Sequence, residues 1–252
     1  MSTNLIPAIK PAGGASAPQD SAIDELPVCA LSPQSVTRYW VLCGLFAAAG
    51  ILAMAVDVPL SRAMVAANAS PSPGKLREGL RDFLGSMEPF GQPPTIVAVA
   101  LAVYLCGANL RQAAFRIAGS FVIASLAVLS VKMCISRIRP VALFTQQIDF
   151  DGRALDTFQG IFRGTRGGTA YQSFPSGHTT AAVAFCLALA AIVPRGRWLF
   201  APLAGLVALQ RIECGAHFLS DTLFAASLAC VVHVAVFDNG PLSRWFSRLE
   251  SK

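Results

Sequence analysis

The sequence predicts an all-α membrane protein: a bundle of six transmembrane helices, with one further helix lying in the membrane interface. Three observations support this fold class, namely the composition, six apolar segments and the Arg residues in two of the short connections. Hydrophobic residues make up 54% of the 252 residues and charged residues only 13%, whereas soluble domains carry about 25% charged residues. A soluble bundle of buried helices fits the segment lengths, but it fits neither the low charge nor the scarcity of polar faces.

The six apolar segments are the expected membrane spans. A helix needs about 20 residues to cross the hydrocarbon core, and several segments are shorter than this. The last four each adjoin a polar cluster, where the helix is expected to project beyond the lipid. The segments cover residues 39–56, 94–110, 117–135, 176–193, 198–212 and 220–237.

The chain divides into one domain and two tails. Residues 1–37 are rich in Ala, Pro, Ser and Gly and show no periodicity, which is typical of a disordered tail. They lack a basic start followed by an apolar core, so we do not expect a signal peptide. We assign residues 38–240 to the six-span domain and residues 241–252 to a C-terminal tail.

Arginine and lysine residues orient the predicted spans. The connection between the second and third segments, and that between the fourth and fifth, contain Arg and no acidic residue. Cytoplasmic loops carry an excess of Lys and Arg, so we expect these loops and both termini in the cytoplasm. The polar clusters then face the extracytoplasmic side. The cations are Arg111, Arg116, Arg195 and Arg197, with Arg244, Arg248 and Lys252 in the C-terminal tail.

Two connections contain structure of their own. Between the first two segments, apolar residues recur at helical spacing from Leu76 to Met87, with charged residues on the other face. This pattern predicts an amphipathic helix in the membrane interface, although an amphipathic helix packed on the bundle fits nearly as well. Residues 141–175 form a long connection punctuated by aromatic residues, which favours a loop on the substrate side.

The first polar cluster holds two cations at the end of the third segment. Lys132 and Arg139 are seven residues apart, close to two helical turns, so on a continuous helix they point the same way. Arg137 then points elsewhere and is expected to be merely interfacial. Pro140 is expected to end the segment. Taken alone, the two cations also fit plain interfacial anchors.

The second cluster combines a helix start with a histidine. Pro175 and Ser176 are typical of a helix N-terminus, and Gly177 allows the backbone to approach a ligand closely. Free N–H groups at a helix N-terminus bind phosphate well, and the hydroxyl of Ser176 is a further possible donor. A plain N-cap accounts for Ser176 but leaves His178 unexplained.

The third cluster pairs a histidine with a carboxylate. His217 and Asp221 are four residues apart and share a face if they are helical. A carboxylate bonded to one ring nitrogen fixes the tautomer and leaves the other nitrogen as a nucleophile. Arg211 presents a planar fork suited to phosphate oxygens. Together the clusters offer three cations, a helix N-terminus and two histidines, a set that suits a phosphoryl group.

These three clusters, in this order, resemble the type 2 phosphatidic acid phosphatases, within the lipid phosphate phosphatase and vanadium haloperoxidase superfamily. The family signature is Lys, six residues and Arg-Pro; then Pro-Ser-Gly-His; then Ser-Arg, five residues, His, three residues and Asp. Gln210 stands where the family usually has Ser, an amide that alters contacts around the site. The six-helix layout extends the resemblance over about residues 38–240. The matching residues are Lys132, Arg139, Pro140, Pro175, Ser176, Gly177, His178, Arg211, His217 and Asp221.

The resemblance implies a role for each of these positions. His217 is expected to attack phosphorus and form a phosphohistidine, while Asp221 orients it. His178 is expected to protonate the leaving alkoxide and then activate water. No metal or other cofactor is implied. The residues expected to hold the phosphoryl oxygens are Lys132, Arg139, Ser176, Gly177 and Arg211.

The expected activity is therefore hydrolysis of a lipid phosphate or lipid pyrophosphate at the membrane, and residues 215–221 favour a bacterial inner membrane. The net charge of +6 needs no nucleic-acid partner to explain it. Three questions stay open: which lipid is the substrate, the oligomeric state, and whether the phosphate passes to an alcohol instead of water. A six-span transporter or lipid-binding protein is the non-enzymatic alternative. His233, inside the last segment, is expected to be a packed or interfacial residue with no catalytic part.

Overall fold

The computed structural model describes residues 32–70, 74–107, 110–146, 148, 150–161, 168–238 and 240–250. Residues 1–31 of the predicted N-terminal tail lie outside this part of the chain. Ser32 caps the first helix by accepting a hydrogen bond from the backbone N–H of Ser35. The helix therefore includes residues 33–37, which we had assigned to the tail.

Six helices correspond to the six predicted apolar segments. Among the described residues, α1, α4 and α8 are long and apolar enough to cross a membrane, whereas α3 and α6 are apolar but shorter. Among the described helices, length and composition therefore support three of the six predicted spans. The six helices are α1 (Pro33–Asn68), α3 (Pro93–Leu105), α4 (Arg111–Cys134), α6 (Gly177–Ile192), α7 (Arg197–Glu213) and α8 (Leu219–Phe237).

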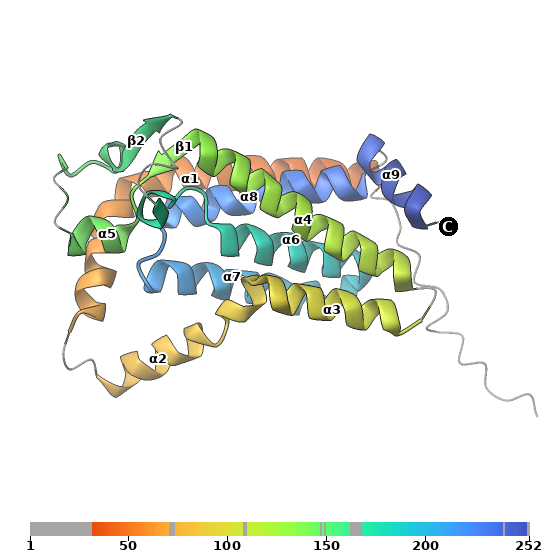
Figure 1. The fold of residues 1–252 in the computed structure, drawn as a ribbon, viewed down its shortest axis with the longest axis horizontal. Helices are drawn as coiled ribbons and strands as arrows, with labels where there is room; N and C mark the ends of the chain where they lie inside the picture. Colours follow the sequence, from red (N-terminus) through yellow and green to blue (C-terminus); the bar gives the residue numbers. More distant parts are fainter. Residues whose placement is uncertain are drawn as a thin grey trace, which may run out of the picture.

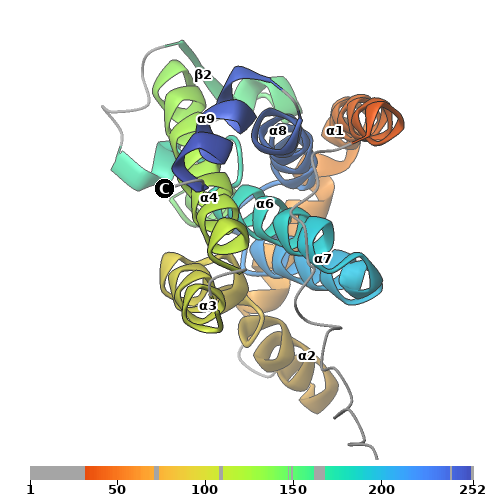
Figure 2. The same ribbon diagram turned by 90° about the vertical axis from the view of Figure 1, so that its right-hand side faces the viewer.

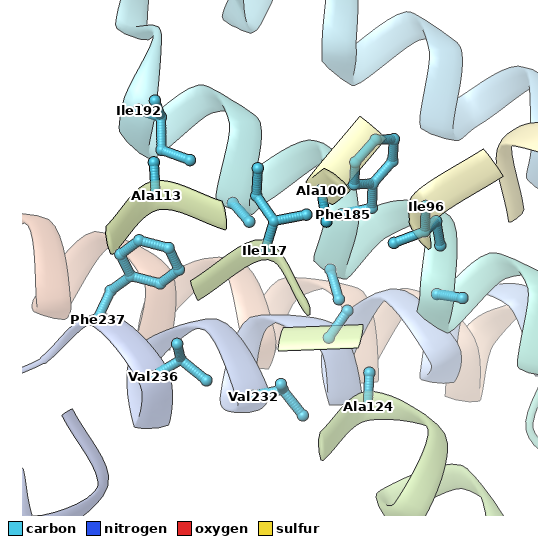
Figure 3. Packing of buried hydrophobic residues seen from close by; sticks show 14 of the residues in the cluster. Ile96, Ala100, Ala113, Ile117, Ala124, Phe185, Ile192, Val232, Val236 and Phe237 are labelled. Atoms are coloured by element: carbon cyan, nitrogen blue, oxygen red, sulfur yellow. The ribbon is translucent and has the colours of Figure 1, made fainter. Parts of the chain in front are cut away.

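Helix α6 lies at the centre of the bundle, with α3, α4, α7 and α8 around it and α1 outside α8 (Figure 2). Small residues allow this close packing, because helix backbones approach where side chains are short. Ala182 and Ala188 of α6 are completely buried. Apolar side chains from α3, α4, α6 and α8, among them Ile117 and Phe185, fill the core between them (Figure 3).

Helices α1 and α4 present apolar side chains outward. Leu45 and Leu52 of α1 and Leu126 of α4 are each more than half exposed, which is the arrangement expected where a helix faces lipid. At about 1.5 Å per residue, the 36 residues of α1 exceed the roughly 30 Å of the hydrocarbon core. One end of α1 therefore extends past the lipid.

The long connection after α4 departs from an all-α fold. Strand β1 (Ile135–Arg137) pairs antiparallel with β2 (Phe158–Ile161) to form a two-stranded ribbon. Pro140 does not end α4, which stops at Cys134; instead it begins the short helix α5 (Pro140–Thr145), as suits a residue with a preset φ and no N–H. The described part of the connection also contains two 3-10 turns, η3 (Ala154–Thr157) and η4 (Gly168–Tyr171).

Two amphipathic helices flank the bundle. The helix predicted after the first span is present as α2 (Lys75–Gly85); Leu76 is 89% exposed and Leu84 is buried. Figure 1 shows α2 at the end of the molecule that carries α5. The 3-10 turn η1 (Glu88–Gly91) then leads to α3. At the opposite end, the predicted C-terminal tail forms α9 (Pro241–Glu250), whose Phe246 packs on Gly119 of α4.

Candidate active site

The three polar clusters meet at the end of the bundle where α4 ends and α6 and α8 begin (Figure 1). Each predicted residue sits at a helix terminus or in an adjoining loop, where the chain leaves the apolar core. Lys132 is in the last turn of α4, Arg139 caps α5 and Arg211 is in the last turn of α7. His178 is in the first turn of α6, and Asp221 is in the first turn of α8.

Hydrogen bonds tie the clusters together. The ammonium of Lys132 donates to the carbonyl of Gln172 at 2.6 Å, joining the first cluster to the second. The hydroxyl of Ser173 donates to Asp221 Oδ2 at 2.6 Å, and the backbone N–H of Ser176 donates to the carbonyl of Asp221 at 3.2 Å. Segments distant in sequence thus form one polar site.

The three cations of the site, Lys132, Arg139 and Arg211, lie close together, but not for the reason that the sequence indicated. Lys132 and Arg139 do not share a helix face, because the helix ends between them and β1 follows. They nevertheless lie near enough to Arg211 for the three charges to interact. The Nε atoms of Arg139 and Arg211 are buried without an acceptor among the described residues. Burial, and next the charge of Arg211, lower the pKa of Arg139, and a bound anion would offset both effects.

Ser176, which we predicted as a donor to phosphate, is also the N-cap of α6. Its hydroxyl is completely buried, accepts a hydrogen bond from the backbone N–H of Thr179, and bonds the hydroxyl of Thr179 at 2.9 Å. This N-cap fixes the start of α6, where Gly177 and His178 are the first two residues. Their backbone N–H groups belong to the first helical turn, where N–H groups have no partner within the helix.

His217 lies in the loop before α8, so it does not share a helix with Asp221. Its Nδ1 is 2.6 Å from the carbonyl oxygen of Ser173, and 3.8 Å from Asp221 Oδ2. Because a carbonyl only accepts, this contact places the proton on Nδ1 and leaves the lone pair on Nε2. The carbonyl of Ser173 therefore fixes the tautomer, and Asp221 supports the ring from further away.

The protonation state of His217 provides a first prediction. Burial lowers the pKa of His217 to about 4, although Asp221 opposes the shift. Because the folded-state value lies below the usual one of about 6.5, the ring stays neutral at neutral pH and gains a proton only in acid. We expect the ¹⁵N shifts of this imidazole, assigned by their loss in His217→Gln, to titrate near pH 4. A midpoint at or above 6.5 would contradict this environment.

Arg137 is not interfacial, contrary to our expectation. Its side chain is completely buried and bonds two carboxylates, Asp57 of α1 at 2.8 Å and Asp221 at 2.5 Å. It also donates to Ser220 and Thr157, and its guanidinium lies over the ring of Phe218 at 4.1 Å. The β1 strand makes this possible, because it turns Arg137 inward as α4 ends.

Asp57 is a buried residue of the site that sequence reasoning missed. Besides Arg137, it accepts hydrogen bonds from the backbone N–H and the hydroxyl of Ser220, at the start of α8. A signal was present, since an acidic residue at the end of an apolar segment is costly unless it is paired or used. Asp57 and Asp221 thus share the buried guanidinium of Arg137.

Glu88 of η1 is a second acidic residue that we did not predict in the site. Its Oε1 accepts a hydrogen bond from Arg211 Nη1 at 2.7 Å and lies 3.6 Å from His178 Nε2. Its Oε2 accepts from Gln210 Nε2 at 3.3 Å. The sequence offered little signal, since Glu88 follows an amphipathic helix rich in charge.

Gly91 sets how closely η1 approaches α6. A Cβ at this position would lie 2.7 Å from the carbonyl oxygen of His178 and 3.0 Å from Val207. We expect Gly91→Ala to destabilise the fold by about 1–3 kcal/mol and to lower activity by shifting Glu88 and His178 apart. Thermal unfolding in detergent measures the first effect, and the rate of phosphate release, the activity that the resemblance implies, measures the second.

Gly79→Ala is the matched control, because Gly79 lies in α2 with open space around it. This change is expected to be neutral or slightly stabilising. If Gly91→Ala behaved like Gly79→Ala, the close contact between η1 and α6 would be wrong.

A cavity of about 290 Å³ opens beside the site. At one end it is lined by Lys132, Gly177 and His178. From there it follows α4 through Val128 and Ser125 to Phe121, so its remaining walls are mainly apolar. A molecule with an anionic head and an apolar tail would match a cavity with one polar end and otherwise apolar walls.

Comparison with known families agrees with this arrangement. Residues 96–244, more than half of the chain, match the family model described as the PAP2 superfamily. The chain belongs to the PAP2 superfamily. The match contains all three polar clusters, whereas Asp57 and Glu88 lie before it.

Relatives of this PAP2 chain include two proteins named lipid A 1-phosphatase, from Rhizobium johnstonii and Rhizobium etli. Each is 42% identical over 57 residues, which is 23% of this chain. The match spans 23% and 25% of the two relatives, about a quarter of their length.

Two solved structures are similar at 17% sequence identity and a TM-score of 0.48. Aquifex aeolicus LpxE matches over 71% of this chain and 93% of its own. A PAP2-type phosphatidylglycerolphosphate phosphatase from Bacillus subtilis matches over 85% of this chain and 96% of its own.

Proposed function

We propose that this PAP2 protein is a membrane enzyme that hydrolyses a lipid phosphate or lipid pyrophosphate through a phosphohistidine intermediate. One observation carries the proposal: His217, oriented by the carbonyl of Ser173, and a second histidine lie in one site with three cations. The name lipid A 1-phosphatase, carried by the two Rhizobium relatives, supports a lipid phosphate, and lipid A phosphate is the first candidate substrate.

In the first half of the reaction, His217 is the nucleophile. Its Nε2 lone pair attacks phosphorus and forms an N–P bond, while the bond between phosphorus and the leaving oxygen breaks. His178 gives its proton to that oxygen. The Nδ1–H of His217 remains bonded to the carbonyl of Ser173, and Asp221 stabilises the charge that the ring acquires.

In the second half, the now neutral His178 takes a proton from water. The resulting nucleophile attacks phosphorus, the N–P bond breaks, and inorganic phosphate leaves. Lys132, Arg139, Arg211 and the N-terminus of α6, at Ser176 and Gly177, hold the phosphoryl oxygens. Their charge acts on the equatorial oxygens of the transition state, which is the part that metal ions play in other phosphoryl transfers.

The membrane holds the rest of the substrate. Exposed apolar side chains on α1 and α4 support a position in the bilayer, and the cavity running along α4 from Lys132 suits the lipid tail. We place the site on the extracytoplasmic face of a bacterial inner membrane, with six spans and both termini in the cytoplasm. The basis for this placement is the group of Arg residues at the start of two helices: Arg111 and Arg116 in the first two turns of α4, and Arg195 and Arg197 just before and at the start of α7.

A substrate panel tests the proposal. Purified protein in detergent is given phosphatidic acid, phosphatidylglycerol phosphate, a polyprenyl pyrophosphate and lipid A, and released phosphate is measured with and without EDTA. We expect release from at least one lipid, unaffected by the chelator and inhibited by orthovanadate, which mimics pentacoordinate phosphorus. Transfer of label to an alcohol without phosphate release, or no turnover of any lipid, would contradict it.

A further inference from the structure

We propose that Glu88, fixed by Gln210 and Gln92, is a positioning residue that keeps His178 protonated for the first half of the reaction. The inference rests on the proposed function, because it assigns to His178 the role of proton donor. It concerns the pair formed by Glu88 and His178, which is separate from the pair formed by Asp221 and His217. No motif of the resemblance includes Glu88.

The proton on His178 needs such a partner. A proton donor must enter the reaction charged, yet burial opposes a charge on this ring, and so do the nearby charges of Arg211, Lys132 and Arg139. Glu88 is the carboxylate that acts in the other direction, with Oε1 3.6 Å from His178 Nε2. An opposite charge at such a distance favours the protonated imidazole.

The carboxylate of Glu88 is held in place. Gln210 Nε2 donates to Oε2, and Gln92 Nε2 donates to Oε1, both at 3.3 Å. These amides belong to different elements, α7 and the N-cap of α3. If a phosphoryl group replaces Glu88 as the partner of the Arg211 guanidinium, the Glu88 carboxylate still has the amides of Gln210 and Gln92. It also still has His178 as a neighbour.

This arrangement accounts for the departure of Gln210 from the resemblance. A serine in its place is too short to make the same bond, whereas the amide reaches across to η1. The close fit of Gly91 against the carbonyl of His178 holds the two elements at this separation. Glu88, Gln210 and Gly91 thus form one structural unit around His178.

Leaving-group dependence separates this role from a merely structural one. An alkoxide must be protonated as its bond to phosphorus breaks, whereas p-nitrophenolate is stable without a proton. The test compares kcat/KM for a short-chain alkyl phosphate and p-nitrophenyl phosphate, because kcat/KM reports steps up to the loss of the leaving group. Neither probe is a lipid, so a wrong choice of lipid in the proposed function leaves the comparison intact.

We expect Glu88→Gln to lower kcat/KM for the alkyl phosphate by about tenfold to a hundredfold, and that for p-nitrophenyl phosphate by less than about threefold. Gln210→Ser is expected to show the same selectivity with a smaller loss, which keeps the test decisive if Glu88→Gln folds poorly. Glu78→Gln, an exposed acid on α2, is the matched control and should change neither value.

Two results would overturn the inference. Equal losses for both probes would mean that Glu88 only supports the fold. Gains for both probes, with tighter inhibition by orthovanadate, would mean that the carboxylate competes with the phosphoryl group for Arg211.

Discussion

His217→Gln is expected to lower phosphate release by at least about a thousandfold while leaving the protein folded. The change removes the Nε2 lone pair that attacks phosphorus, and residues that act as one catalytic unit show losses of this size or larger when one is removed. Binding of the anion should survive, because the three cations remain. Initial rates of phosphate release, compared with the affinity for inorganic phosphate, separate the two effects.

His233→Gln is the matched control. His233 is buried in α8, with its ring 4.4 Å from that of Tyr39 and 4.7 Å from that of Phe237, in keeping with the packing role that we predicted. We expect its replacement to affect stability but not the rate per folded molecule. Turnover that persisted in His217→Gln would rule out this residue as the nucleophile.

Arg137→Met is expected to destabilise the protein by about 3–5 kcal/mol, because removing one member of a buried charge network leaves the others uncompensated. The two carboxylates of Asp57 and Asp221 lose their shared cation, and both side chains are completely buried. Activity should fall as well, since Asp221 then lacks the partner that holds it beside His217. Denaturant unfolding in detergent measures the first effect.

Arg197→Met controls for the loss of a cation. Arg197 is exposed and lies over the ring of Trp198, so we expect a change within about 0.5 kcal/mol. Arg137→Met/Asp57→Asn should recover part of the stability, because it removes one of the two orphaned charges. An unfolding curve of Arg137→Met that matched the wild type would show that the network contributes little.

The parts of the site that could be predicted from the sequence are those that local patterns specify. Pro175 and Ser176 mark a helix start wherever they precede an apolar run, and α6 begins at Gly177. Leu76, Leu80 and Phe83 show helical spacing, and α2 forms there. The family signature then brought Lys132, His178 and His217 into one hypothesis, and the structure places them at one end of the bundle.

The parts that escaped prediction depend on contacts between distant segments. Arg137 was judged by its angle on a helix that ends three residues before it, so its partners Asp57 and Asp221 were missed. The ribbon of β1 and β2 is short and pairs across a long connection, which leaves no repeated pattern to detect. Glu88 reaches His178 only because Gly91 lets η1 dock on α6.

The most direct test of the central claim is a structure of the protein with orthovanadate. Our account predicts vanadium bonded to Nε2 of His217, its oxygens held by Lys132, Arg139 and Arg211, and the imidazole of His178 within hydrogen-bond distance of the apical oxygen. Vanadate bound away from His217, or a separation that keeps His178 from reaching the same ion, would contradict the account.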